Sequence, residues 1–487
     1  DRNTTSLLTP GIYSMSTPFR ELLDFDVATL ATKLRAREIS PVELTEAYLG
    51  RIEQTDGQLR AYITVTDTLA RKAAKKAEAE IAAGKWRGPF HGVPIALKDL
   101  VYTKGIRTTG GSKILADFKP DHDATVWTRL NRAGAVLLGK LNLHEFAYGI
   151  TSSNPHYGIV RNPYALDRIP GGSSGGSAAA IVARSAAATI GTDTGGSIRI
   201  PAALCGCVGL KPTWSRVSRY GVLPLAYTLD HVGPITRTVR DAAMMLQVIA
   251  GADRNDSTSS RERVPDFSAG LDSEITGMRV GVIRELNDGL SDDVARSFNT
   301  ALETLRSLGA TVDHVSIPSL PMAGVMNGII TWAEALEIHE EWMRTRPQDY
   351  GDDVRRILEI GMMTPATSYI RAQRARARTL AESIAVLSNH DVLVAPASSI
   401  AAPKIGTTHI LEAREDRVDV VAAILRFTQP FNTTGQPAIA IPTSLSPDGL
   451  PIAMQIVGRP FGEPEIIRVA ASYERARGAI APPPEIA

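Results

Sequence analysis

The sequence contains only two cysteines in 487 residues, and they stand one residue apart, at Cys205 and Cys207. That spacing suits neither a disulfide nor a zinc site, so we expect two small residues of an apolar core. No apolar run reaches the roughly 18 residues that a membrane-spanning helix needs. The start of the chain lacks the apolar stretch of a secretory signal peptide, which predicts a cytoplasmic protein with no membrane partner.

An excess of charge of either sign is missing as well. Lys plus Arg number 53 against 52 for Asp plus Glu, which gives a formal net charge of +1. This balance predicts that nucleic acid is not a partner, because nucleic-acid-binding proteins usually carry a strongly basic surface. With 44% hydrophobic residues, the chain can form one large core or two or three smaller domains.

The usual motifs of metal and nucleotide chemistry are also absent. None of the nine histidines belongs to a His-x-x-x-His pair, and His144-Glu145 and His339-Glu340 lack the second histidine of a zinc protease. Gly172-Ser-Ser-Gly-Gly-Ser177 lacks the lysine of a phosphate-binding P-loop, and no Gly-x-Gly-x-x-Gly follows a predicted strand. We therefore predict a site that uses neither a metal ion nor a cofactor.

What the sequence does contain is an alternation of helical and strand-like segments. Capping residues and apolar periodicity predict helices in the N-terminal third, one after Ser40-Pro-Val-Glu43 and one over 68–83. Further helices are predicted at about 123–133 and 175–184. Short apolar runs between them predict buried strands at 92–101, 135–138 and 187–192. Helix, glycine and strand in this order are typical of an α/β domain built from βαβ units.

The same two patterns continue to the end of the chain. Helices are predicted at 237–250 and 291–308, and charged helical sequence fills 322–388. Strands are predicted at 278–283, 311–317, 391–396, 437–442 and 451–458, followed by a last helix from Glu463.

No segment is rich enough in Gly, Ser or Pro to act as a linker that divides the chain. The chain begins with Asp rather than Met, and we interpret residues 1–16 as a flexible, processed or vector-derived extension. We therefore predict one domain over 17–487, with a variable helical region at about 320–390 on the substrate side.

Two serines lie between glycines, Ser173 in Gly171-Gly-Ser-Ser-Gly175 and Ser197 in Thr194-Gly-Gly-Ser197. Flanking glycines permit a tight turn that points several backbone N–H groups at one spot, as an oxyanion hole requires. The first motif formally matches a Gly-x-Ser-x-Gly nucleophile elbow, but the predicted loop at 161–170 stands where an elbow needs a strand. No serine has a lysine three residues later, which excludes the Ser-x-x-Lys arrangement.

With these two arrangements set aside, Lys98 is the remaining candidate for the base that activates a serine. It directly follows the apolar run Gly92-Val-Pro-Ile-Ala-Leu97, which is predicted to be an interior strand. An unpaired buried ammonium is strongly disfavoured, so a lysine in an interior strand has a lowered pKa. In its neutral form the amine is a competent general base. A lysine that reaches solvent or pairs with Asp99 fits the same pattern, so Lys98 by itself does not identify a site.

Four motifs together resemble the amidase signature family. They are Gly92-Val-Pro-Ile-Ala-Leu-Lys-Asp99, Pro170-Gly-Gly-Ser-Ser-Gly-Gly-Ser-Ala178, Gly191-Thr-Asp-Thr-Gly-Gly-Ser-Ile-Arg-Ile-Pro201 and Gly209-Leu-Lys-Pro-Thr213. Phe431-Asn432, Gly435-x-Pro437 and Gly449–Gly458 continue the resemblance, which covers nearly the whole chain apart from the tail and parts of 251–390. It implies a single large α/β domain, with a signature core at about 92–213 and a central mixed, twisted β-sheet covered by helices on both faces.

The resemblance also implies a Ser-cisSer-Lys triad. Ser197 would be the nucleophile, Ser173 the bridging serine after a cis peptide bond, and Lys98 the base. The oxyanion hole would be formed by the backbone N–H groups of Thr194, Gly195, Gly196 and Ser197. The residues expected to orient this loop are Ser174, Asp193 and Arg199, and those expected to line the acyl pocket are Tyr148, Gly149 and Ile150.

The leading expectation is a stand-alone amidase, active as a monomer or homodimer on a small-molecule substrate. An acyl-enzyme would also serve esters and carbamates, and aryl or hydrophobic substrates are favoured, as in an arylamidase or urethanase. The alternative is the amidase subunit of a tRNA-dependent amidotransferase, which liberates ammonia from glutamine within a complex. A non-catalytic binding protein on the same fold is a third reading, which the intact Lys98, Ser173 and Ser197 disfavour.

The pocket should discriminate between the first two functions. The α-amino and α-carboxyl groups of glutamine require a paired acid and base. Asp352, Asp353, Arg355 and Arg356 lie in the expected region of the sequence.

Overall fold

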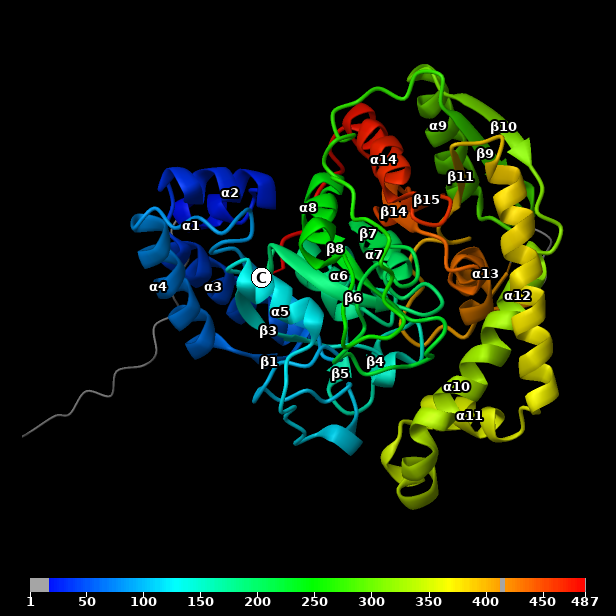
Figure 1. The fold of residues 1–487 in the computed structure, drawn as a ribbon, viewed down its shortest axis with the longest axis horizontal. Coiled ribbons are helices and arrows are strands. Elements are labelled where there is room, and N and C mark those ends of the chain that lie inside the picture. Colours follow the sequence, from blue (N-terminus) through cyan, green and yellow to red (C-terminus); the bar gives the residue numbers. More distant parts are fainter. Residues whose placement is uncertain (1–16, 412–416, 487) are drawn as a thin grey trace, which may run out of the picture.

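Eleven strands of the described part of the chain form one mixed sheet through the middle of the molecule (Figure 1). The computed structural model describes residues 17–411 and 417–486. The strand order is β1-β3-β2-β6-β8-β7-β14-β15-β11-β9-β10. These strands are β1 Tyr62–Val65, β2 Pro94–Lys98, β3 Val136–Leu141, β6 Ala188–Asp193, β7 Val208–Lys211, β8 His231–Thr236, β9 Arg279–Ile283, β10 Thr311–Val315, β11 Val392–Pro396, β14 Ala438–Leu445 and β15 Pro451–Val457. Two small hairpins add β4 Ser153–Asn154 with β5 Gly158–Ile159, and β12 His409–Leu411 with β13 Arg417–Asp419.

The N-terminal half of the sheet brings the two expected catalytic segments to one edge. β2 is parallel to β3 and to β6, with Ile95 opposite Leu137 on one side and Ala188 on the other. β2, β3 and β6 are buried along their whole length, as expected of strands covered on both faces. Because parallel strands end at the same edge, Lys98 at the end of β2 lies beside the last residues of β6, and its Nζ reaches Thr192 Oγ1.

Helices cover both faces of the sheet, as the resemblance implied. α6 and α7 pack against each other and against β6, β7 and β14, whereas α8 and α14 pack against each other and against β8 and β14. Apart from α10 to α13, whose bounds follow below, the α-helices of the described residues are α1 Thr17–Leu22, α2 Val27–Ala36, α3 Pro41–Leu59, α4 Asp67–Ala82, α5 Thr125–Arg132, α6 Gly175–Val182, α7 Arg199–Cys205, α8 Val239–Ile249, α9 Asp292–Ser307 and α14 Glu463–Arg477. No helix in the described ranges is both long enough and apolar enough to cross a membrane.

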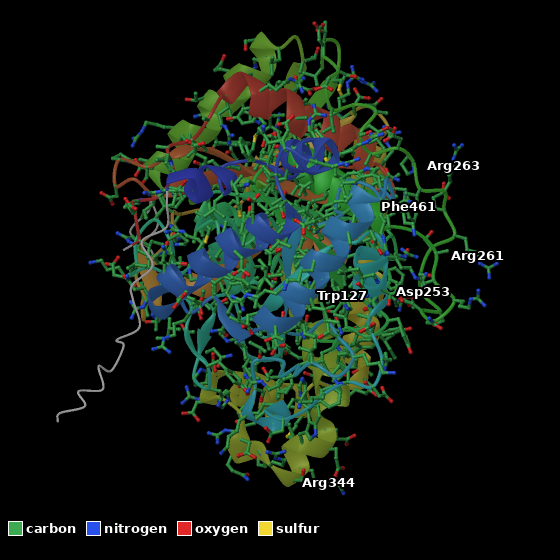
Figure 2. The ribbon with its side chains drawn as sticks, turned by 90° about the vertical axis from the view of Figure 1, so that its left-hand side faces the viewer. Trp127, Asp253, Arg261, Arg263, Arg344 and Phe461 are labelled. Atoms are coloured by element: carbon green, nitrogen blue, oxygen red, sulfur yellow. The ribbon has the colours of Figure 1, made fainter. Side chains whose placement is uncertain are left out.

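The helical region predicted at 322–388 forms an arm at the edge of the molecule. It consists of α10 Ala323–Thr345, α11 Asp352–Met362 and α12 Ala366–Leu387, and α10 also packs against α13 Val420–Thr433. The arm lies on the right in Figure 1, and Figure 2 shows Arg344 at its far tip. α10 and α13 reach back from this arm toward the end of β6.

Three strands of the sheet differ from the sequence prediction, because β1, β7 and β8 were not expected. β7 and β8 contain glycine, which usually weakens a strand, and β8 also contains proline. Close packing explains the glycines: a Cβ on Gly209 would lie 2.7 Å from Ala202 Cβ, and one on Gly233 would lie 2.2 Å from Leu210 O. The predicted N-terminal extension at 1–16 lies outside the described residues.

Candidate active site

Lys98 is completely buried at the end of β2. Its Nζ donates to Ser173 Oγ at 2.7 Å and to Thr192 Oγ1 at 2.9 Å. Burial lowers the pKa of Lys98 to about 7, although the carboxyl groups of Asp193 and Asp230 act to raise it. An amine with this pKa is half neutral near pH 7 and can accept a proton from a hydroxyl.

Asp99 does not pair with Lys98, which was one alternative reading of the sequence. Asp99 Oδ1 instead lies 3.1 Å from the buried Lys140 Nζ, and Asp99 Oδ2 accepts from Thr109 N at 2.8 Å. Lys98 is therefore left with hydroxyl partners only, which suits a proton acceptor.

The segment that carries Ser173 is held by backbone and side-chain contacts. The Gly172–Ser173 peptide bond is cis. Ser173 O accepts from His144 N at 3.1 Å and from Ser152 Oγ at 3.3 Å. A Cβ on Gly172 would lie 2.8 Å from Ile150 C, so only glycine fits against the neighbouring loop.

Ser174 joins this segment to the turn that carries Ser197. Its backbone N–H donates to Ser197 O at 3.2 Å, and its hydroxyl donates to Thr192 O at 3.1 Å. Ser197 is 5% exposed, and its Oγ makes no hydrogen bond to another residue in the described ranges. The Lys98–Ser173 contact is therefore formed here, and the Ser173–Ser197 contact is not.

Four consecutive N–H groups between β6 and α7 have no acceptor among the residues described. They belong to Thr194, Gly195, Gly196 and Ser197. The carbonyl oxygens of the same four residues are all hydrogen-bonded: Thr194 O to Asn327 Nδ2 (3.1 Å), Gly195 O to Thr428 Oγ1 (2.6 Å), Gly196 O to Ile200 N (2.6 Å) and Ser197 O to Ser174 N (3.2 Å). A turn with bonded carbonyls and free N–H groups can hold an anionic oxygen.

Asp193 and Arg199 clamp the two ends of this turn. Both side chains are completely buried, and Arg199 Nε and Nη2 each lie 3.1 Å from a different Asp193 oxygen. Asp193 Oδ2 also accepts from Ile198 N at 3.1 Å. Burial raises the pKa of the Asp193 carboxyl, but the Arg199 guanidinium outweighs burial and holds that pKa below its usual value.

A cavity of about 220 Å³ adjoins the turn. Thr192 and Thr194 line its inner end, and Thr194 Oγ1 donates to Asp230 Oδ1 at 2.6 Å. The other residues that line it are Leu100, Ala147, Arg219, Tyr220, Val222, Leu223, Pro224, Leu225, Tyr227, Asp230, His231, Val232, Asn255, Asp256 and Ser257.

The predicted acyl-pocket residues are not among those that line this cavity. Tyr148 and Ile150 are buried, and Ile150 packs with Ile200 and Ile424 next to the Ser173 segment. Burial raises the pKa of the Tyr148 phenol, whose hydroxyl has no hydrogen-bond partner in the described part of the chain. Gly149 packs against His144, and a Cβ there would lie 2.3 Å from His144 Nε2. Their role as a pocket stays a prediction.

The four charged residues considered for glutamine recognition are also absent from the cavity lining. Asp353 Oδ2 lies 2.9 Å from His144 Nε2, and Arg355 Nη2 donates to Asp352 Oδ1 at 3.2 Å. Within residues 17–411 and 417–486, no group of three or more His, Cys, Asp or Glu side chains could hold a metal ion.

Sequence reasoning missed Thr192, Asp230, Asn327 and Thr428. Thr192 ends a predicted strand, immediately before Asp193. Its place next to Asp193 in the Gly191–Pro201 motif was the one feature of the sequence that pointed to it. Asn327 and Thr428 lie on α10 and α13, more than a hundred positions from Ser197, and nothing in their local sequence marks them.

Comparison with known proteins places the chain in a family. The Amidase family profile matches residues 43–467. The chain belongs to this family. A relative from Geobacter metallireducens, named as a subunit of glutamyl-tRNA(Gln) amidotransferase, is 42% identical to it over 481 residues, which cover 94% of this chain and 98% of the relative. The chain is therefore an amidase-signature amidohydrolase.

Solved structures share the fold over nearly the whole length. One is described as a vestigial protein complex that reveals the evolutionary origins of an s-triazine catabolic enzyme. It is 35% identical with a TM-score of 0.89 and covers 92% of this chain and 98% of that chain. A bacterial aryl acylamidase of the amidase signature family is 27% identical with a TM-score of 0.86, and the match covers 93% of this chain and 96% of that chain.

The comparison with the Geobacter metallireducens relative corrects the prediction about partners. We expected a monomer or homodimer that meets only a small molecule and no nucleic acid. A relative that matches almost the whole chain is named as one subunit of an enzyme that acts on glutamyl-tRNA(Gln), so that expectation is wrong. The reasoning failed because a net charge near zero describes the whole surface and does not report on one interface.

Proposed function

We propose that this chain hydrolyses the side-chain amide of glutamine, as the amidase subunit of a tRNA-dependent amidotransferase. The observation that carries the catalytic part is the buried Lys98, 2.7 Å from Ser173 Oγ, beside four free N–H groups that end at Ser197. The relatives named as subunits of glutamyl-tRNA(Gln) amidotransferase support the choice of substrate and complex.

In the proposed mechanism, neutral Lys98 accepts the proton of Ser173 as Ser173 accepts that of Ser197. The Ser197 hydroxyl turns toward Ser173 for this step and attacks the amide carbon. The N–H groups of the turn stabilise the oxyanion of the tetrahedral intermediate. The proton then returns through Ser173 to the leaving nitrogen, ammonia departs, and water hydrolyses the acyl-enzyme to glutamate.

The charged groups of the cavity support a substrate with an α-amino and an α-carboxyl group. The Arg219 guanidinium lies 4.8 Å from the Tyr227 ring and 5.1 Å from the Trp214 ring, and its buried Nε–H has no acceptor among the described residues. Asp230 and Asp256 line the same cavity. Arg219 thus offers a donor for the carboxylate and Asp256 an acceptor for the ammonium. The oxygens of Asp230 already accept from Thr194 Oγ1 and from the backbone N–H groups of Leu225 and Ala226.

A second candidate function is hydrolysis of less polar amides by the chain alone. Most residues that line the cavity are uncharged, among them Leu100, Ala147, Val222, Leu223, Pro224 and Leu225. An acyl group without charge would fit against these side chains.

The test is a substrate panel with the purified full chain: glutamine, anilides, aryl carbamates and p-nitrophenyl acetate. We expect ammonia release from glutamine, abolished by Ser197→Ala and by Lys98→Met and retained by Ser185→Ala. Ser185 is a suitable control because its buried hydroxyl donates to Ala180 O at 3.2 Å, away from the site. Turnover of anilides without glutamine would favour the second function, and full activity in Ser197→Ala would refute the mechanism.

Recognition of glutamine has its own test in the same panel. Arg219→Gln should raise KM for glutamine about 10-fold or more, because an ionic hydrogen bond to the carboxylate is lost. KM for p-nitrophenyl acetate, which has no carboxylate, should stay unchanged. Arg261→Gln is the control, since Arg261 points into solvent in Figure 2. Equal effects of Arg219→Gln on both substrates would contradict this assignment.

A further inference from the structure

Two of the four carbonyl groups in the Thr194–Ser197 turn are bonded by helices from the far end of the chain. Asn327 on α10 donates through Nδ2 to Thr194 O at 3.1 Å. Thr428 on α13 donates through Oγ1 to Gly195 O at 2.6 Å. Asn327 is 3% exposed and Thr428 is completely buried, so water does not compete for either bond.

These two bonds fix the direction of the N–H groups that follow them. A trans peptide unit is planar, and its C=O and N–H point in opposite directions. Thr194 C=O shares a peptide unit with Gly195 N–H, and Gly195 C=O shares one with Gly196 N–H. Drawing the two oxygens toward α10 and α13 therefore turns the two N–H groups to the opposite side, away from these helices.

The turn needs such external anchors because two of its residues are glycine. Glycine adopts more backbone conformations than any other residue, so Gly195 and Gly196 do not hold their own orientation. Thr428 is seated tightly against them: a Cβ on Gly196 would lie 2.2 Å from Thr428 Oγ1. A small rotation of either peptide unit would thus break its bond to the helix.

We propose that Asn327 and Thr428 are positioning residues that aim the Gly195 and Gly196 N–H groups at the oxyanion. The proposal rests on the proposed function in one respect, the role of Ser197 as nucleophile. It gives α10 and α13 a part in transition-state stabilisation, whereas the sequence placed the region at 320–390 on the substrate side only. Neither residue touches the reacting atoms; each acts through the turn.

The experiment compares Thr428→Val with Thr428→Ser and Thr433→Val in the full chain. Valine keeps the shape of threonine and lacks the donor, whereas serine keeps the donor. Thr433 is the matched control because it lies on the same helix, is completely buried, and donates to Ala323 O of α10 at 3.0 Å without contacting the turn. Asn327→Leu tests the second anchor in the same way.

Four quantities are measured for each variant: kcat and KM for p-nitrophenyl acetate, affinity for 1,1,1-trifluoro-4-phenylbutan-2-one, and the melting temperature. Ser197 adds to the carbonyl of the trifluoromethyl ketone, which places an oxyanion in the turn. The affinity for this ketone therefore reports directly on the oxyanion hole. Titration with a fluorophosphonate, which labels the active serine, corrects kcat for any misfolded fraction.

We expect Thr428→Val and Asn327→Leu to lower kcat by about 10- to 100-fold with little change in KM, since the loss of one oxyanion donor costs on the order of 100-fold or more. Affinity for the trifluoromethyl ketone should fall in the same proportion. Thr428→Ser should restore both values. Thr433→Val should change neither kcat nor the affinity for the trifluoromethyl ketone, although it should lower the melting temperature, as Thr428→Val does.

Two outcomes would overturn the proposal. One is a Thr428→Val enzyme whose kcat per labelled serine equals that of Thr433→Val. The other is a fall in kcat without a fall in affinity for the trifluoromethyl ketone. Failure of the serine chemistry on which the proposal rests looks different: the unaltered chain would then neither react with the fluorophosphonate nor hydrolyse any substrate of the panel. Failure of the glutamine assignment alone would leave the fluorophosphonate reaction and the hydrolysis of p-nitrophenyl acetate intact.

Discussion

At the scale of single residues, the site depends on a lysine whose pKa is lowered to about 7. Lys98 has no carboxylate partner, and its Nζ meets only the hydroxyls of Ser173 and Thr192. Burial disfavours the ammonium form, and the nearby carboxyl groups of Asp193 and Asp230 limit the fall in pKa. The chemistry therefore follows from a balance between desolvation and two nearby negative charges.

This balance predicts a pH dependence with a definite sign. Because the neutral amine is the base and the pKa of Lys98 is about 7, kcat/KM should rise as pH increases through about 7. Asp230→Asn removes a charge that raises this pKa, so the rise should move to lower pH. The exposed Asp448→Asn is the control. The measurement is kcat/KM from pH 5 to 9, and an unshifted profile for Asp230→Asn would contradict the role assigned to its charge.

Gly196 is the second residue whose identity the geometry dictates. Its φ is +142°, and an added Cβ would lie 2.6 Å from Ile200 Cδ1 as well as 2.2 Å from Thr428 Oγ1. We expect Gly196→Ala to lower kcat by about 100-fold or more, because the turn must move out of alignment.

Gly84→Ala provides the matched comparison for Gly196→Ala. Gly84 has a φ of +76° but nothing within 4 Å of an added Cβ. Its substitution should cost about 1 kcal/mol of unfolding free energy and leave kcat unchanged. Similar kinetics for the two variants, measured on soluble folded protein, would show that the turn tolerates the displacement.

At the scale of elements, the decisive unit is β6, the turn and α7. The strand ends at Asp193 and the helix begins at Arg199, and their buried ion pair closes the turn between them. Arg199 also donates to Gln455 Oε1 at 3.0 Å and to Asn432 Oδ1 at 2.6 Å. The clamp thus connects the N-terminal motifs to β15 and α13, which come more than two hundred residues later.

Breaking this clamp should destabilise the whole protein. Arg199→Met leaves the Asp193 carboxylate buried and unpaired, which costs about 3 to 5 kcal/mol of unfolding free energy. The pKa of Asp193 is held below its usual value, so this contribution is present at neutral pH and is lost as pH falls below the ordinary carboxyl range. Urea unfolding at pH 7 measures the difference.

An exposed ion pair serves as the control for Arg199→Met. Arg344 pairs with Glu341, and their side chains are 73% and 66% exposed. Arg344→Met should change the unfolding free energy by about 1 kcal/mol at most. A loss for Arg199→Met no larger than this would mean that the buried pair does not hold the turn.

At the scale of the whole molecule, an aromatic cluster joins the helical arm to the loop that contacts the Ser173 segment. Phe146 packs against α10, with its ring centroid 4.6 Å from that of His339 and 5.6 Å from that of Trp342. Its neighbour His144 donates a backbone N–H to Ser173 O. Displacement of the arm should therefore reach the relay as well as the oxyanion turn.

A comparison of two buried phenylalanines tests this coupling. Phe146→Ala and Phe267→Ala should each cost about 3 to 5 kcal/mol in chemical denaturation, because both rings are almost completely buried. Only Phe146→Ala should also lower kcat per folded molecule, by about 10- to 100-fold, through a shift of the Ser173 segment. Equal kcat values in the two variants would argue that the cluster only stabilises the fold.

The sequence alone singled out Lys98, Ser173 and Ser197, because each stands in a pattern that is local in the chain. Glycines around Ser173 and Ser197 and an apolar run before Lys98 are contiguous patterns. Of the missed strands, β7 and β8 contain glycine for reasons of packing. The sequence motifs also placed the chain among amidase-signature proteins, whereas the composition misjudged its partners.

Only the tertiary structure decided which distant side chains complete the site. Thr192 shares Lys98 with Ser173 because β2 and β6 are parallel neighbours. Asn327 and Thr428 hold the oxyanion turn because α10 and α13 pack over the end of β6. A single hydrogen bond from a helix leaves no periodic pattern in the sequence, since its partner is chosen by how the helices pack against the sheet.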